Sequence, residues 1–112
     1  MSDTNSNHSL NHVNLIGKVT SEPKVTQLEN GRKVAKFSLS TKEFYLDADG
    51  NMKSRSNWHI LTAWGKWIKV LEEFGSVGTK VAVEGRLVSR FYNTQGQKKF
   101  VSEVEINDLI LL

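Results

Sequence analysis

Cysteine is absent from this sequence, and proline occurs only once. Without thiols the chain can form neither disulfides nor thiolate metal sites, and it has no cysteine nucleophile. No apolar run approaches the roughly 20 residues that a membrane-spanning helix needs, so no span is predicted. Residues Met1 to His12 are polar and lack the basic start and apolar stretch of a secretory signal. The expected location is therefore the cytoplasm.

Residue patterns that support catalysis are also scarce. His8 and His12 are four residues apart, but their polar segment has no helix signal and no acidic partner that would complete a metal site. His59 stands alone in a strand-like segment, where a hydrogen-bonded histidine at a packed surface is the ordinary role. Residues 75–78 lack the Lys-Ser/Thr pair of a phosphate-binding loop. The sequence predicts a protein that is not an enzyme and has no metal ion or cofactor.

What the sequence does contain is sufficient for one folded unit. Its 112 residues match a single domain of roughly 100–150 residues. Lysine and arginine together number 15 against 12 acidic residues, which gives a formal net charge of +3. This excess is compatible with a polyanionic partner but does not require one. We expect one domain over residues 12–112, preceded by a flexible N-terminal arm over residues 1–11.

Several segments have the β-branched and aromatic content, or the two-residue alternation, of β-strands. They are Val13–Val19 with a bend at Gly17, Lys24–Leu28, Val34–Thr41, Trp58–Trp64, Lys80–Phe91 and Phe100–Ile106. Turn-forming residues predict hairpins at Asn30-Gly31, at Asp47–Asn51 and at Asn93–Gln97. In the segment Val34–Thr41, alternation directs Phe37 and Leu39 to the core.

One helix is predicted over Lys66–Phe74. Trp67, Val70, Leu71 and Phe74 recur at three- and four-residue spacing, and Gly75 can end the helix. We expect the Trp67 and Phe74 rings in the core. Strands, one short helix and further strands in this order predict an all-β, five-stranded Greek-key barrel of the OB type with extended hairpin arms, a fold whose faces commonly bind oligonucleotides.

Basic residues are interleaved with aromatic residues along the strands and turns. A protein that binds single-stranded DNA without sequence preference needs rings to stack on bases and cations along the phosphates. We predict stacking by Phe44, Trp58 and Tyr92, which lie beside turns or among polar neighbours, and by Trp64, for which a core position is an equal alternative. The predicted phosphate-binding residues are Lys36, Lys42, Lys53, Arg55, Lys66, Arg86, Arg90, Lys98 and Lys99.

The same segments, in the same order, resemble the bacterial single-stranded DNA-binding protein family (SSB). The resemblance covers almost everything from Asn11 onward. It rests on residues 11–17 (NHVNLIG), 22–25 (EPKV), 30–31 (NG), 34–41 (VAKFSLST), 58–59 (WH), 64–66 (WGK) and 83–87 (VEGRL). Each segment is weak evidence by itself, but their number and order are specific.

The resemblance implies an OB-fold that assembles as a homotetramer, with a dimer as the alternative, and binds single-stranded DNA around its outer surface. It implies that Phe44, Trp58, Trp64 and Tyr92 are the stacking residues, and that His59 lies at the subunit interface. Familiar members carry tryptophan at the first and last of the four stacking positions and phenylalanine at the third. Stacking requires a π-face rather than one ring type, so we expect binding to be retained.

The resemblance further implies a role in coating single strands on the nucleoid during replication, recombination and repair. Members of this family typically continue into a flexible linker with an acidic tip that recruits partner enzymes, whereas this chain stops at Leu112. Tail-mediated partners are therefore not expected, whether the chain is a natural tail-less relative or a shortened form. Two other functions stay open. One is an interaction subunit, similar to a primosomal replication protein, that recruits a replication partner. The other is an oligosaccharide-binding OB-fold, for which fewer cations beside the rings are expected.

Overall fold

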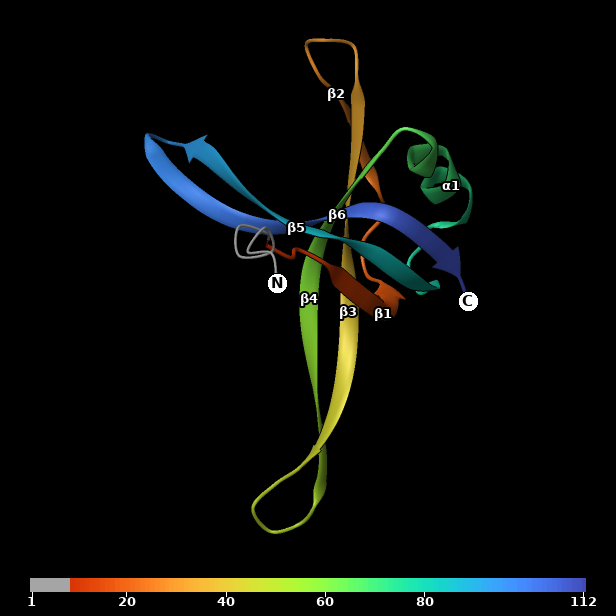
Figure 1. The fold of residues 1–112 in the computed structure, drawn as a ribbon, viewed down its shortest axis with the longest axis vertical. Coiled ribbons are helices and arrows are strands. Elements are labelled where there is room, and N and C mark those ends of the chain that lie inside the picture. Colours follow the sequence, from red (N-terminus) through yellow and green to blue (C-terminus); the bar gives the residue numbers. More distant parts are fainter. Residues whose placement is uncertain (1–8) are drawn as a thin grey trace, which may run out of the picture.

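The strands form a closed barrel in the computed structural model, which describes residues 9–112 (Figure 1). The elements are β1 (Val13–Val19), β2 (Lys24–Gln27), β3 (Lys33–Leu46), β4 (Met52–Trp64), α1 (Lys66–Phe74), β5 (Lys80–Thr94) and β6 (Gln97–Leu111). The strand order is β1-β5-β6-β4-β3-β2, and β1 also pairs with β3. This additional pairing closes five strands into the predicted barrel, while β2 remains a short strand at the edge of β3.

The N-terminal arm is only partly within the described residues. Residues 1–8, including His8, lie outside them. The side chain of Asn11 donates a hydrogen bond to the Leu87 carbonyl (2.7 Å) and accepts one from the Leu87 N–H (2.8 Å). The chain is therefore attached to β5 just before β1 begins.

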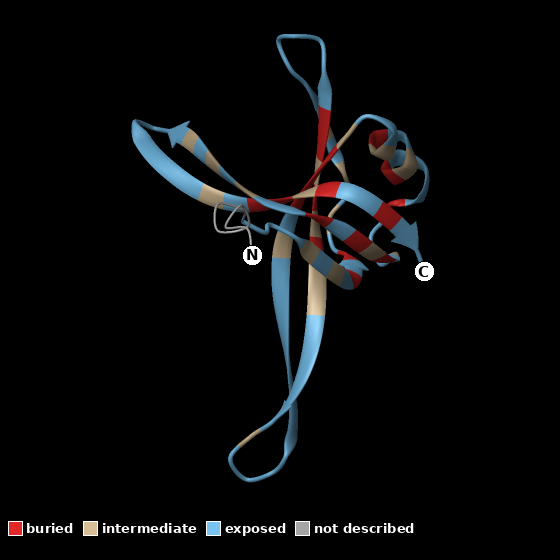
Figure 2. Cartoon of the chain, in the orientation of Figure 1, coloured by how far each residue is buried: buried red, intermediate tan, exposed pale blue. Residues whose placement is uncertain are grey.

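Two long hairpins project from the barrel. The β3–β4 hairpin is paired from Val34 opposite Trp64 to Leu46 opposite Met52, well beyond the predicted strand ends. The β5–β6 hairpin closes at Gln95-Gly96 with φ of 53° and 78°, as a two-residue turn with positive φ at both positions requires. Outside the barrel nearly every residue is exposed (Figure 2). The outer parts of these arms have no buried face, so their sequence lacks the alternation that predicts strand length.

The core lies inside the barrel and beneath α1. Phe37 and Leu39 are buried as predicted. Ile68 and Leu71 are the buried residues of α1, and Trp67 packs partly against the same core. The prediction for Phe74 was wrong, because this ring at the end of the helix is 52% exposed. Helical spacing predicts the direction in which a side chain points, but not how far the core extends along the helix axis.

Two glycines permit close approach of backbones where the barrel is closed. β1 pairs with β5 from Val13 to Lys18 and with β3 only at Lys18 and Val19. A Cβ atom at Gly17 would lie 2.1 Å from the Ser40 carbonyl oxygen. At Gly85, next to an irregularity in the β5–β6 register, a Cβ would lie 2.1 Å from the Glu105 carbonyl oxygen. Both positions therefore require glycine for steric reasons.

Replacing Gly17 with alanine is expected to lower the free energy of unfolding by about 2 kcal/mol or more, because backbone must move to admit the methyl group. Urea denaturation measures this change. The control is Gly31→Asn, at a turn with open space around it and a φ of 85°, a conformation that asparagine tolerates. Equal stability of the two variants would contradict the role of Gly17 in closure.

Candidate nucleic-acid interface

One face of the β3–β4 hairpin carries three of the four predicted stacking rings. Phe44 lies opposite Ser54, Trp58 opposite Ser40, and Trp64 opposite Val34. Residues opposite each other share a face, and successive residues alternate between faces. The three rings therefore lie on one face. Phe44 and Trp58 are 66% and 68% exposed, and Trp64 is half-buried.

The fourth predicted ring, Tyr92, meets this surface from the other hairpin. An open groove of about 560 Å³ lies between the hairpins and is lined from β2, β3, β4 and β5. Trp64 and Tyr92 both line it, together with Lys36. Thr62 also lines the groove, and its buried hydroxyl has no hydrogen-bond partner among the described residues. The groove therefore continues the aromatic face of the β3–β4 hairpin.

Three of the rings have a cation beside them. Lys36 Nζ lies 4.5 Å from the Tyr92 ring centroid, and Lys42 Nζ lies 5.8 Å from that of Phe44. The Arg32 guanidinium carbon lies 4.6 Å from the Trp64 ring centroid. Such pairs put positive charge close to the ring on which a base would stack, where it can attract the phosphates of that nucleotide. The sequence analysis missed Arg32, although the Asn30-Gly31 hairpin already placed it close to the end of the Trp64 strand.

A buried carboxylate that the sequence analysis also missed connects the two sides of the groove. Glu103 on β6 is 1% exposed. Its oxygens accept hydrogen bonds from Tyr92 Oη (2.7 Å) and Arg90 Nε (2.8 Å), and Lys36 Nζ lies 3.1 Å away. Lys36 also donates a hydrogen bond to the Tyr92 hydroxyl. Two predicted phosphate-binding residues and one predicted stacking residue thus have a common partner.

The charge state of this cluster follows from its contacts. Burial disfavours ionised Glu103, but the hydrogen bonds from Tyr92, Lys36 and Arg90 outweigh it and hold the pKa of Glu103 below its ordinary value. Burial likewise opposes the charge on Lys36, yet its contacts with Tyr92 and Glu103 raise the pKa of Lys36 above its ordinary value. The cluster is therefore an ionised carboxylate with two cations and a phenol.

The other predicted phosphate-binding residues are not gathered at the groove. On the opposite face of the β3–β4 hairpin, Arg55 and Lys53 lie near the carboxylates of Glu43 and Asp47, respectively. Arg86 pairs with Glu105 on the β5–β6 hairpin. Three further lysines lie on α1 or near the tip of the β5–β6 hairpin, and these are Lys66, Lys98 and Lys99.

His59 faces away from the aromatic surface. It lies opposite Leu39 in the register, and its Nε2 is 2.9 Å from the Thr41 hydroxyl. A hydrogen-bonded, half-buried histidine agrees with the role predicted for it from the residues around it.

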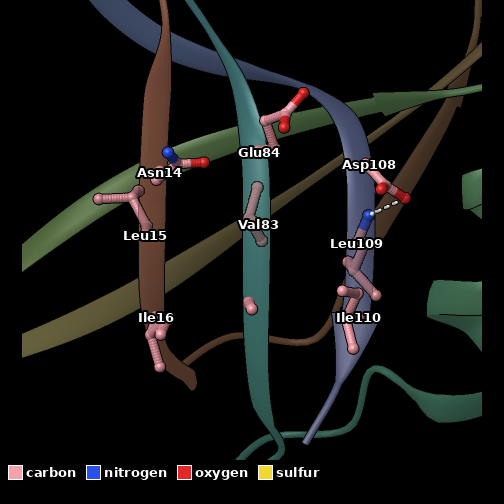
Figure 3. Close-up of a pocket in the computed structure, with 9 residues that line it drawn as sticks. Asn14, Leu15, Ile16, Val83, Glu84, Asp108, Leu109 and Ile110 are labelled. Carbon is pink, nitrogen blue, oxygen red and sulfur yellow. Dashed lines mark hydrogen bonds between the residues drawn. The ribbon is translucent and has the colours of Figure 1, made fainter.

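A second surface lies on the outer face of β1, β5 and β6 (Figure 3). A shallow depression of about 250 Å³ is lined there by residues of the three adjacent strands. Ile16, Ala82 and Ile110 form one row across it, because each is opposite the next in the register. Ile16 and Ile110 are 61% and 58% exposed. This face is apolar along one row of the sheet and open to solvent.

This arrangement of strands and rings matches a known protein family. The model of the "Single-strand binding protein family" matches residues 10–112. The chain belongs to the single-strand binding protein family. Its OB-type barrel is also found in the solved structure described as "Plasmodium falciparum SSB complex with ssDNA". The two structures superpose with a TM-score of 0.83 and are 36% identical, over 94% of this chain and 96% of the Plasmodium chain.

Curated single-strand binding proteins extend further than this chain. "Single-stranded DNA-binding protein 1" of Chlorobaculum tepidum is 35% identical over 105 residues, which are 92% of this chain and 65% of that protein. A single-stranded DNA-binding protein of Neisseria meningitidis serogroup A is 32% identical over 93% of this chain and 60% of that protein. The chain thus spans less than two thirds of the length of these relatives.

Neither a metal site nor a membrane-spanning helix is found in residues 9–112. Within this range no three His, Cys, Asp or Glu side chains are placed to hold a metal ion. In the same part of this single-strand binding family member, no helix is long and apolar enough to cross a membrane.

Replacing Glu103 with glutamine is expected to lower the free energy of unfolding at pH ~7 by about 2 kcal/mol or more, because charged donors lose their buried acceptor. The lowered pKa of Glu103 means that its contribution is complete above the pKa of the unfolded chain and is lost as the pH falls through the folded value. The difference between wild type and variant should therefore shrink towards pH ~3. Urea denaturation across this pH range measures it, with the exposed Glu29→Gln as control. A difference that is constant with pH would contradict the ionised cluster.

Proposed function

We propose that the protein binds single-stranded DNA with little regard to sequence, by stacking bases on Phe44, Trp58, Trp64 and Tyr92 and contacting phosphates with lysine and arginine. By doing so it protects single strands on the nucleoid of the cytoplasm during replication, recombination and repair. It binds and carries out no chemical step.

The observation that carries this proposal is the continuity of the aromatic surface. Three rings share one face of the β3–β4 hairpin, and the groove beside Trp64 leads to Tyr92. Cations next to these rings provide attraction for the phosphates, and each stacked base contributes about 1–3 kcal/mol. The homologous protein from Plasmodium falciparum, described in complex with single-stranded DNA, supports the same ligand.

We assign the phosphate contacts by exposure and pairing. Lys42 lies on the aromatic face beside Phe44, so it is the first candidate. Lys36 and Arg90 reach the groove, but both form ion pairs with Glu103. The remaining basic residues lie further from the groove and would contact a DNA strand that continues around the molecule. They are Lys53, Arg55, Lys66, Arg86, Lys98 and Lys99.

Replacing Trp58 with alanine should weaken binding to a poly-dT oligonucleotide about fivefold or more, since a stacked base is worth at least about 1 kcal/mol. Fluorescence anisotropy of a labelled oligonucleotide measures the affinity without relying on the tryptophans themselves. The matched control is Tyr45→Ala, which removes an aromatic ring from the opposite face of the same hairpin and should have little effect.

The salt dependence separates stacking from phosphate contact. Each phosphate contact on a single strand contributes about −0.7 to the slope of log affinity against log salt concentration. Lys42→Gln should make the slope shallower by about that amount, whereas Trp58→Ala should leave it unchanged. Unaltered affinity in folded Trp58→Ala would remove this ring from the site. No binding by the wild type would favour the interaction-subunit function.

We further propose that the protein assembles as a homotetramer, as its family resemblance implies, and that the outer face of β1, β5 and β6 takes part. The apolar row of Ile16, Ala82 and Ile110 supports this assignment, since Ile16 and Ile110 are exposed and Ala82 between them is half-buried. Ile16 and Ile110 are labelled in Figure 3. Residues Val13 to Gly17 pair with β5 but not with β3, so one edge of this part of β1 is available to another strand.

Replacing Ile16 with lysine is expected to lower the solution mass of the assembly, because an apolar contact would have to accommodate a charge. Light scattering measures the mass of wild type and variant at equal concentrations. Val77→Lys is the control, since Val77 is similarly exposed but lies outside this row. A monomeric wild-type protein would contradict the assembly.

A further inference from the structure

The outer half of the β5–β6 hairpin carries two aromatic side chains that lie outside the predicted stacking set. Phe91 and Phe100 are opposite each other in the register. Their ring centroids are 5.0 Å apart and the ring planes meet at 66°, an edge-to-face arrangement. The two residues are 64% and 60% exposed. An apolar pair this open to solvent, on a hairpin that contributes nothing to the core there, indicates a binding surface.

The immediate surroundings of the pair are basic. Lys98 Nζ lies 5.4 Å from the Phe91 ring centroid, and Lys99, which lies opposite Tyr92, is on the groove face of the same hairpin. Among the described residues, neither lysine forms an ion pair with a carboxylate. These charges are therefore available to a ligand. Lysine is depleted at protein–protein interfaces, whereas a polyanion with flat apolar bases suits rings and cations equally.

The pair also adjoins the groove. Phe91 lines the groove together with Tyr92 and Trp64. On the hairpin side, the lining residues within 9–112 come from β5 and none comes from β6. The β5 edge is thus where the groove meets the hairpin. Neighbouring residues of a β-strand point to opposite faces of the hairpin. A bound single strand of DNA that passes from Tyr92 across the β5 edge therefore reaches Phe91.

We propose that Phe91, Phe100 and Lys98 form a second stacking platform for single-stranded DNA, reached from the groove across the β5 edge. The proposal rests on the function proposed above and extends it to the opposite face of the β5–β6 hairpin. A strand bound in this way passes from Trp64 and Tyr92 in the groove to the phenylalanine pair, with Lys98 near its phosphates.

The test compares side chains that differ in the π-face but little in apolar size. Phe91→Leu should weaken binding of a dT oligonucleotide of about 35 residues roughly fivefold or more, whereas Phe91→Trp should keep the wild-type affinity, because stacking tolerates any aromatic ring. Phe74→Leu is the matched control, since Phe74 is similarly exposed but lies on α1. Anisotropy of a labelled oligonucleotide gives the affinities, and light scattering without DNA gives the mass of each variant.

Weaker binding by Phe91→Leu at unchanged mass, with Phe91→Trp and Phe74→Leu like wild type, supports the platform. Wild-type affinity of Phe91→Leu overturns it and leaves DNA binding by the groove intact. A change of mass in Phe91→Leu also overturns it, because the pair would then be a contact between copies of the chain. If the wild type does not bind the oligonucleotide, both this proposal and the proposed function fail.

Discussion

Closure of the barrel depends on one short strand that pairs on both sides. β1 has seven residues, yet it must pair with β5 along most of its length and with β3 at its end. The backbones approach so closely at Gly17 that a Cβ has no space. The groove is lined from four different strands, and β1 joins two of them, β5 and β3, across the closure of the barrel. Steric fit at one glycine therefore helps to hold Tyr92 of β5 and Trp64 of the β3–β4 hairpin at the same groove.

The Glu103 cluster shows how a negative charge can be held within the surface that we propose binds DNA. The carboxylate is almost completely buried and accepts hydrogen bonds from Tyr92 and Arg90, with Lys36 beside it. Its burial is unfavourable, but the fixed donors compensate for it. The result is a Tyr92 ring held in place at the groove by the buried carboxylate, while Lys42, which forms no ion pair among the described residues, lies further along the aromatic face.

Most parts of the fold that pack on the core could be predicted from the sequence, and the parts that project from it could not. The exception is the end of β6, which was predicted to stop at Ile106 but continues to Leu111 and buries Leu109. Residues Val13–Val19 and Lys66–Phe74 are found with the predicted bounds, because core packing imposes periods that a sequence displays. The hairpin arms were predicted too short since both of their faces are exposed. Even spacing placed Trp58 and Trp64 on one face, and the hairpin register added Phe44. Glu103 had no signal, because its burial arises from contacts between side chains of β3, β5 and β6, which lie far apart in the chain.

The spacing of the rings along β4 has a consequence for how a strand is held. Ser54, which lies opposite Phe44, is four positions before Trp58, and Trp64 is six positions after it. At about 3.3 Å per residue these intervals are about 13 Å and 20 Å. Stacked bases in a duplex repeat at about 3.4 Å, so neighbouring rings cannot hold neighbouring stacked bases. On the function proposed above, a DNA strand on this surface would be anchored at separate points, with unheld nucleotides between them. Such a strand would be released one anchor at a time, without breaking all the contacts in a single step.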